Sequence, residues 1–183
     1  GIGDDCAFIK NLENTLITTD MLLDGKHFDT KQHKISEVIN KVFAVNCSDI
    51  YAMGGLPTYA TLAVSFPKTT SDNPENFCKQ DFIESINLAA NKFQITLLGG
   101  DTNYWDAPLC ISMTLMGAPL FGPVTRSNAK VGDLIYVSGK LGGSMKHNRH
   151  LIPPDKRELV KALSKVTVNS MLDISDGLAG DLR

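Results

Sequence analysis

The sequence lacks the features that mark membrane proteins and nucleic-acid-binding proteins. No apolar run approaches the roughly 18 to 20 residues that a membrane-spanning helix needs. The 183 residues carry 18 basic and 20 acidic side chains, which gives a net charge of −2 with no dense basic stretch. We therefore expect neither nucleic acid nor a membrane as a partner.

Cysteine is sparse and irregularly spaced. The four cysteines are Cys6, Cys47, Cys78 and Cys110. No C-x-x-C pair occurs, so neither a zinc site nor a disulfide framework is indicated. Three of the four thiols lie in apolar runs. We expect buried, reduced thiols in a cytoplasmic protein.

Familiar phosphate-binding motifs are also missing. The sequence has no G-x-x-x-x-G-K-[ST] and no G-x-G-x-x-G. The stretch SGKLGGS, residues 138–144, contains glycines and a lysine at the wrong spacing for a P-loop. It is equally compatible with a plain flexible loop and with a loop that contacts phosphate. His147 and His150 form an i, i+3 pair without further ligands, so they do not indicate a metal site.

Strands and helices alternate in the first two thirds of the chain. Apolar residues recur with helical spacing from Ile35 to Val45, and Gly54-Gly55 would end that helix. Asn73-Pro74 would open a second helix. Strands are expected at residues 6–23 (two strands joined by a turn at 10–14), 58–67, 94–101 and 109–119. This pattern predicts an α/β or α+β fold.

A Gly-Pro cluster at residues 121–123 predicts a domain boundary, which divides the chain into residues 1–122 and 123–183. Beyond it we expect a short strand at 134–138, an amphipathic helix at 155–166, and then a strand, a loop and a helix start at 170–183. The abrupt first residues, GIGDD, and the incomplete last helix lead us to expect an interior piece of a longer protein.

Aspartates repeatedly follow apolar runs, at points where the chain changes to a turn or a helix. The five are Asp5, Asp20, Asp49, Asp101 and Asp173. Any one of them alone is explained as a turn or helix-cap residue. Together, with Ser or Thr beside three of them, they predict a set of hard oxygen ligands of the kind that Mg²⁺ prefers.

Such a cluster requires cations. Two like charges 4 Å apart repel by about 4 kcal/mol at an effective dielectric constant of 20. Several Mg²⁺ ions in one site are typical of polyphosphate chemistry, in which the metal neutralises a transferring phosphoryl group.

These motifs resemble a known family. GIGDDCAFI, TTDMLLDGKHF, NCSDIYAMGGLP, GGDT, TRSNAKVGD and DISDGL occur in the order seen in thiamine-monophosphate kinases, within the superfamily of aminoimidazole ribonucleotide synthetase. The resemblance implies an enzyme that transfers the γ-phosphoryl group of ATP to thiamine monophosphate. It also implies a homodimer. In each subunit a four-stranded mixed sheet would carry helices on one face, the two sheets would pair into a barrel, and part of a second α/β domain would follow.

The resemblance also assigns roles by position. The implied Mg²⁺ ligands are Asp5, Thr18, Thr19, Asp20, Asp49, Asp101, Asp173 and Asp176. The implied nucleotide contacts are Gly100, Asp101, Arg126 and Ser175, and His27 is the implied substrate contact. Catalysis would rest on Asp49, Asp101 and Asp173. We expect the carboxylates of Asp5, Asp20, Asp49 and Asp101 to converge on one cleft.

Two other functions stay open. One is an ATP-using member of the same superfamily with a different acceptor, and the other is a non-catalytic module that binds nucleotide or metal. The chain is also shorter than the family pattern between GKLGGS and RHLIPP, so we expect a break in the backbone near Ser144.

Overall fold

A mixed sheet forms the base of the molecule. The computed structural model describes residues 7–9, 14–68 and 78–182. Five strands lie in the order β1-β2-β5-β3-β4, and only the β3–β4 pair is parallel. They are β1 (Ala7–Ile9), β2 (Thr15–Leu23), β3 (Gly55–Pro67), β4 (Thr96–Trp105) and β5 (Cys110–Pro119). The five strands expected from the sequence in this part of the chain are all formed. The sheet therefore has one strand more than the four that the family resemblance implied.

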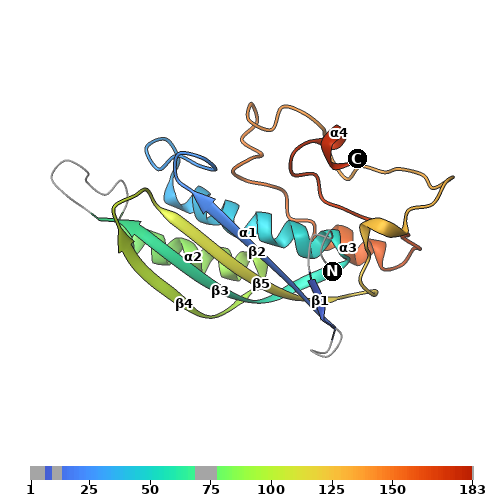
Figure 1. Cartoon of the computed structure of the whole chain (residues 1–183), viewed down its shortest axis with the longest axis horizontal. Coiled ribbons are helices and arrows are strands. Elements are labelled where there is room, and N and C mark those ends of the chain that lie inside the picture. Colours follow the sequence, from blue (N-terminus) through green and yellow to red (C-terminus); the bar gives the residue numbers. More distant parts are fainter. Residues whose placement is uncertain (1–6, 10–13, 69–77, 183) are drawn as a thin grey trace.

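Two helices cover one face of this sheet, as expected (Figure 1). They are α1 (Ile35–Ala52) and α2 (Lys79–Phe93). At the start of α1 the Glu37 side chain accepts the Lys34 N–H at 3.0 Å, and at its end Gly54 adopts φ +72°, which favours glycine. The expected start of the second helix at Asn73-Pro74 lies outside the described residues. Among the described residues, no helix is long and apolar enough to cross a membrane.

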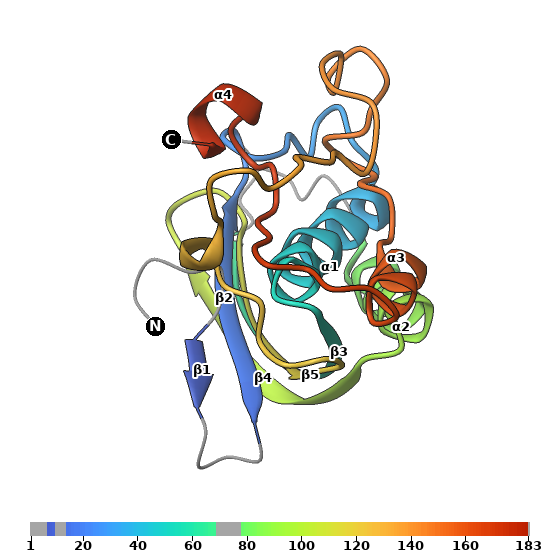
Figure 2. The same ribbon diagram turned by 90° about the vertical axis from the view of Figure 1, so that its right-hand side faces the viewer.

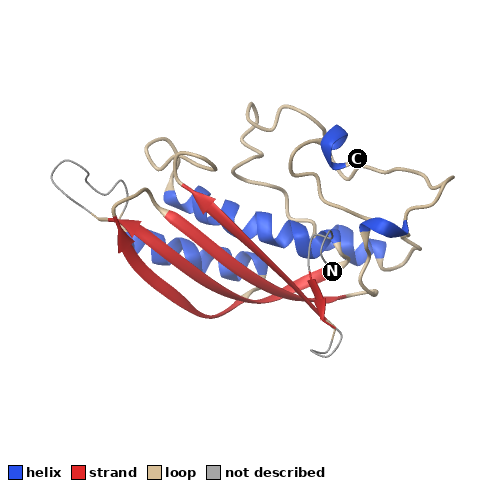
Figure 3. Cartoon of the chain, in the orientation of Figure 1, coloured by secondary structure: helices blue, strands red, loops and turns tan. Residues whose placement is uncertain are grey.

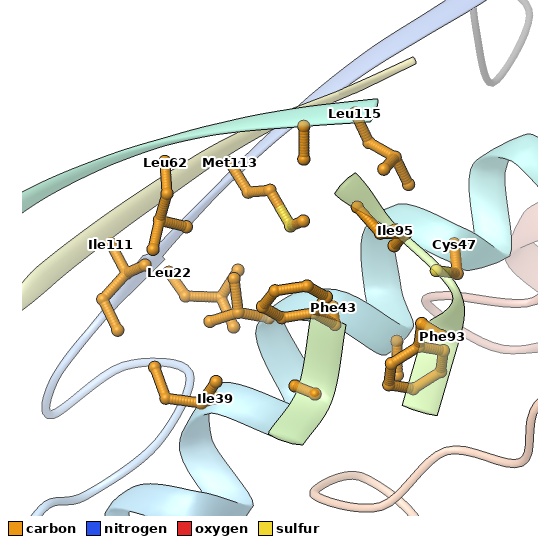
Figure 4. Packing of buried hydrophobic residues seen from close by; sticks show 14 of the residues in the cluster. Leu22, Ile39, Phe43, Cys47, Leu62, Phe93, Ile95, Ile111, Met113 and Leu115 are labelled. Atoms are coloured by element: carbon orange, nitrogen blue, oxygen red, sulfur yellow. The ribbon is translucent and has the colours of Figure 1, made fainter. Parts of the chain in front are cut away.

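The core lies between the sheet and the two helices (Figure 4). Phe43 of α1 and Phe93 of α2 stack with ring centroids 6.1 Å apart, beneath Met113 and Leu115 of β5. All four side chains are fully buried. Burial of one such side chain contributes roughly 1.5–3 kcal/mol. This core fixes α1 against β2, where most of the candidate site lies.

Among the described residues, no helix covers the opposite face of the sheet (Figures 1 and 3). Side chains alternate along each strand, so one set faces the helices and the other faces outward. On the outward face Met21 is 57% exposed and Tyr59 is 48% exposed. Both side chains are therefore in contact with solvent in the single chain.

The last third of the described chain contains little regular structure (Figure 3). It forms η1 (Arg126–Asn128), α3 (Arg157–Leu163) and α4 (Leu178–Asp181). The expected helix at 155–166 is confirmed as α3, but the strands expected at 134–138 and after residue 170 are not formed. Ile135 is 74% and Tyr136 is 84% exposed. These segments lack a neighbouring strand among the described residues, and an extended segment needs such a partner for its backbone hydrogen bonds.

The expected break near Ser144 is also wrong. The backbone is continuous from Gly142 to His150, where the N–H of His147 donates to the carbonyl of Gly143 at 3.1 Å and that of Arg149 donates to Ser144 at 2.9 Å. The domain boundary expected at residues 121–123 stays a prediction.

The cysteines differ in burial. Cys47 is fully buried, Cys110 is half-buried and Cys78 is exposed. The prediction of a buried thiol is therefore wrong for Cys78. All three are free thiols, as expected, and Cys6 lies outside the described residues.

Among the three described cysteines, we expect iodoacetamide to alkylate Cys78 fastest and Cys47 only after unfolding. Burial raises the pKa of the Cys47 thiol far above its usual range, so almost no reactive thiolate forms there. Peptide mass spectrometry after timed alkylation at pH 8 measures the order. Alkylation of Cys47 as fast as Cys78 in the folded protein would contradict the described burial of α1.

Candidate functional site

The candidate site is built around the last two turns of α1. Thr18 of β2 points toward the helices, and its Oγ1 donates a hydrogen bond to Oδ2 of Asp49 at 2.5 Å. Thr18 is only 8% exposed. Alternation along β2 puts Asp20 on the same face, two residues further along the strand. Two expected ligand segments, TTD and NCSD, are therefore in contact.

A buried asparagine holds Asp20 in this arrangement. The N–H of Asp20 donates to Oδ1 of Asn46 at 3.2 Å, while Nδ2 of Asn46 donates to the carbonyl of Val42 at 2.9 Å. Asn46 is fully buried. An unsatisfied buried amide costs about 1–3 kcal/mol, so these two bonds fix its orientation.

Sequence reasoning missed Asn46, although a signal was present. Val42, Asn46 and Ile50 are spaced by four residues, so they lie on one face of α1. Val42 and Ile50 are both fully buried. A polar residue inside an apolar helical stripe indicates a buried polar contact.

The carboxyl group of Asp20 lies in a partly buried position. Burial raises its pKa, and the nearby charge of His27 partly lowers it again. Burial acts because the charged form loses water. A cation at this carboxylate would restore the charged form, so the electrostatics of Asp20 fit a metal or an anchored positive group.

The C-terminal part of the chain reaches the same end of α1. Ser48 Oγ donates to Oδ2 of Asp173 at 2.9 Å, and Ser170 Oγ donates to the carbonyl of Arg126 at 2.8 Å. Asp173, an expected ligand, thus lies beside Asp49, and the segment that carries it runs past Arg126, an expected nucleotide contact. Figure 2 shows this segment passing close to α1.

Ser175 and Asp176 follow Asp173 in an exposed loop before α4. The backbone N–H of Asp176 donates to Oδ2 of Asp181 at 3.2 Å, and that of Gly177 donates to the same oxygen at 3.0 Å. Asp181 therefore shapes the turn that presents both residues.

Two expected site residues lie apart from this group. Thr19 points to the outward face, where its Oγ1 lies 2.9 Å from Oγ1 of Thr114. Asp101 lies on the edge strand β4, separated from Asp20 by β5 and β3. Three strand spacings amount to about 14 Å. The carboxylates of Asp20, Asp49 and Asp101 therefore do not converge within one chain, and Asp5 lies outside the described residues.

Gly100 and Asp101 lie within a strand and not at a turn that follows it. β4 continues through them to Trp105, and Asp101 accepts a hydrogen bond from Nδ2 of Asn103 at 2.9 Å. A Cβ placed on Gly100 would lie 1.8 Å from the carbonyl oxygen of Leu62. Glycine is therefore required here by the close approach of β3.

The donor atoms gathered at α1 fit a hard cation in part. They are hydroxyl and carboxylate oxygens from Thr18, Asp20, Asp49 and Asp173, which is the donor type that Mg²⁺ prefers. Across the described residues, however, no three His, Cys, Asp or Glu side chains form one compact group. Further oxygens, from a phosphate or from another part of the protein, would have to complete the coordination.

Comparison with protein families and known proteins gives a consistent result. Residues 3–118 match the family model of AIR synthase related protein, N-terminal domain. The whole chain is 36% identical over 192 residues to a thiamine-monophosphate kinase of Rhodopirellula baltica, of which it covers 59%. It is 34% identical over 205 residues to the thiamine-monophosphate kinase of Escherichia coli K12, of which it covers 60%. The chain thus spans about three fifths of these relatives, at 59% and 60%.

Solved structures agree. The chain is similar to AaThiL complexed with AMPPCP and TMP, with a TM-score of 0.85, 30% identity and coverage of 98% of this chain and 62% of that one. It also resembles the hydrogenase maturation protein HypE of E. coli, with a TM-score of 0.68 over 92% of this chain and 55% of that one. At 18% identity, the HypE likeness concerns the fold alone.

Proposed function

This chain belongs to the family of AIR synthase related proteins, and from that membership we propose that the protein transfers the γ-phosphoryl group of ATP to the phosphate of thiamine monophosphate, giving thiamine diphosphate. The observation that carries the proposal is similarity over the whole chain to thiamine-monophosphate kinases, at 36% and 34% identity. The likeness to a structure in complex with AMPPCP and TMP supports both substrates.

We propose that the oxygens at the end of α1 hold Mg²⁺. The proposed ligands are Thr18, Asp20, Asp49 and Asp173, with Asp5, Thr19, Asp101 and Asp176 completing the set in the assembled protein. When bound, Mg²⁺ would neutralise the charge on the phosphates of the two substrates. The hydrogen bond from Thr18 to Asp49 supports this role, because it fixes the direction of one carboxylate in advance.

The chain's own residues would mainly position the substrates. The acceptor is a phosphate oxygen that is already anionic, so no strong general base is required. Catalysis then depends on aligning two polyanions and stabilising the transferring group. In the proposal Arg126 clamps nucleotide phosphates with its planar guanidinium, Gly100 and Ser175 contact the nucleotide, and His27 contacts the acceptor.

We propose that a homodimer completes the site. The outward face of the sheet, with Met21 and Tyr59 exposed, is the surface that would pair with a second copy into a barrel. β1 and β4 are the two edges of the sheet. If β4 of one copy lies beside the β1–β2 edge of the other, Asp101 would come near Asp20 of the second copy. This arrangement would account for their separation of about 14 Å within one chain.

Residues 123–183 are proposed to begin a second α/β domain. Ile135 and Tyr136 are exposed apolar residues in a segment with the sequence of a strand. Pairing with strands of such a domain would bury them.

Product analysis tests the function. The full natural protein, incubated with ATP, Mg²⁺ and thiamine monophosphate, should yield thiamine diphosphate and ADP in equal amounts by chromatography. Free thiamine should not be phosphorylated, because the attacking atom is an oxygen of the acceptor phosphate. Equal turnover of thiamine and thiamine monophosphate would contradict the mechanism. ATP use only with another phosphate acceptor would favour a related kinase, and binding without turnover would favour a non-catalytic module.

A further inference from the structure

Lys41 on α1 is a half-buried cation at the edge of the candidate site. Its Nζ donates a hydrogen bond to the backbone carbonyl of His27 at 2.5 Å. Burial lowers the pKa of Lys41, and no described carboxylate offsets that effect. A buried ammonium group is usually paired with a carboxylate. Lys41 is instead bonded to a neutral carbonyl, in the loop that carries the expected substrate residue.

The loop that Lys41 contacts is a tight turn directly after β2. Gly25 adopts φ +78°, its N–H donates to the carbonyl of Phe28 at 2.8 Å, and Phe28 is buried. The N–H of His27 donates to the carbonyl of Leu23 at 2.9 Å. The carbonyl of His27 is therefore the group through which α1 holds the tip of the turn.

The same turn fixes the imidazole of His27. Its Nδ1 accepts a hydrogen bond from the backbone N–H of Leu23 at 2.9 Å. A backbone N–H can only donate, so Nδ1 carries no proton and the proton of the neutral ring is on Nε2. Nε2–H is then a hydrogen-bond donor, at the tip of the turn that Lys41 holds.

We propose that Lys41 is a positioning residue for the phosphate of the acceptor, a phosphate monoester dianion, and that it acts by holding the His27 loop in place. This inference rests on the proposed function. The bond to the carbonyl keeps the Nε2–H of His27 directed for binding, and the ammonium adds a positive charge that no described carboxylate cancels. Both effects favour an anion beside Asp20.

Replacement of Lys41 by methionine tests the proposal. Lys41→Met keeps the length of the side chain and removes the charge and the donor. The matched control is Lys92→Met, because Nζ of Lys92 also donates at 2.5 Å to a neutral oxygen of α1, Oδ1 of Asn40. Both variants are made in the full natural protein, and their melting temperatures are compared with that of the wild type.

We expect Lys41→Met to raise the KM for thiamine monophosphate by at least about tenfold, since hydrogen bonds to charged groups are the stronger class. The KM for ATP should stay within about twofold of the wild-type value, because the nucleotide contacts lie elsewhere. Calorimetric titration of thiamine monophosphate without ATP should show the same weakening. Lys41→Arg should restore most of the affinity, and Lys92→Met should leave both constants unchanged.

The outcomes separate the two proposals. If the wild type turns over thiamine monophosphate and Lys41→Met shows an unchanged acceptor KM and affinity, the role of Lys41 is overturned while the function stands. Equal rises in the KM values for ATP and acceptor would show a structural role only, and would also overturn it. If the wild type neither binds nor phosphorylates thiamine monophosphate, the proposed function fails first. Should Lys41→Met not fold, Lys41→Gln, which keeps a neutral donor, takes its place with the same criteria.

Discussion

Asp49→Asn in the full natural protein should keep the fold and lower kcat by a factor on the order of 10² to 10³, the size seen when one preorganised electrostatic group is lost. The amide oxygen of asparagine can still accept the hydrogen bond that Thr18 donates at 2.5 Å, so α1 and β2 stay joined. The negative charge is lost, and with it the proposed attraction for cations. Steady-state kinetics at saturating ATP and thiamine monophosphate measures the effect.

The control for Asp49→Asn is Asp106→Asn. Asp106 has an 81% exposed side chain and pairs only with Lys68 at 3.0 Å among the described residues. Exposed pairs of this kind contribute about 0–1 kcal/mol, so this variant should keep both its activity and its melting temperature. If Asp49→Asn retained wild-type kcat across a range of Mg²⁺ concentrations, Asp49 would be only a structural partner of Thr18.

The elements of the first 119 residues could be predicted from the sequence because their patterns are local. The apolar stripe of α1 is recognised from the spacing of residues within one or two helical turns, and the end of the helix is recognised from the glycine that follows it. The strands β2, β3 and β5 follow from alternation and from the turns that bound them. Each of these signals depends on neighbours a few residues away, which the sequence displays directly.

Contacts between distant segments could not be predicted in the same way. The N–H of Asp20 donates to the side chain of Asn46, which lies 26 residues further along the chain, and only the fold brings the two together. The bond from Lys41 to the carbonyl of His27 likewise joins an exposed loop to a helix. A carbonyl gives no signal in the sequence, because every residue has one.

The aspartates illustrate both what could be predicted from the sequence and what could not. Asp20, Asp49 and Asp173 are each bonded to a residue of α1 or β2, namely Asn46, Thr18 and Ser48, but their carboxylates do not form one compact group. Asp101 follows the same type of apolar run and yet lies three strands away, because strand order is not encoded by the composition of a strand end. The strand expected at 134–138 failed for a related reason: β-propensity describes how a side chain fits a sheet, and the described chain provides no sheet there.

Gly100→Ala should destabilise the protein more than a Gly→Ala substitution at any other described glycine of β3, β4 or β5. A Cβ at this position would lie 1.8 Å from the carbonyl oxygen of Leu62 and 2.7 Å from its carbonyl carbon. The obstacle is backbone, which cannot rotate away as a side chain does. The register pairs Leu62 with Gly100, so the parallel pairing of β3 and β4 has to open at this point.

We expect a loss of about 3 kcal/mol, the upper part of the usual range for inserting a methyl group into a packed site. For a chain of this size the loss lowers the melting temperature by roughly 6–12 °C. Gly180→Ala in α4 is the control, since a Cβ there meets no atom within 4 Å and should leave the melting temperature unchanged or slightly raised. Thermal unfolding followed by circular dichroism measures both. An unchanged melting temperature for Gly100→Ala would mean that β4 does not lie against Leu62. The glycines of GGDT would then be explained by contact with a ligand instead of by the packing of the sheet.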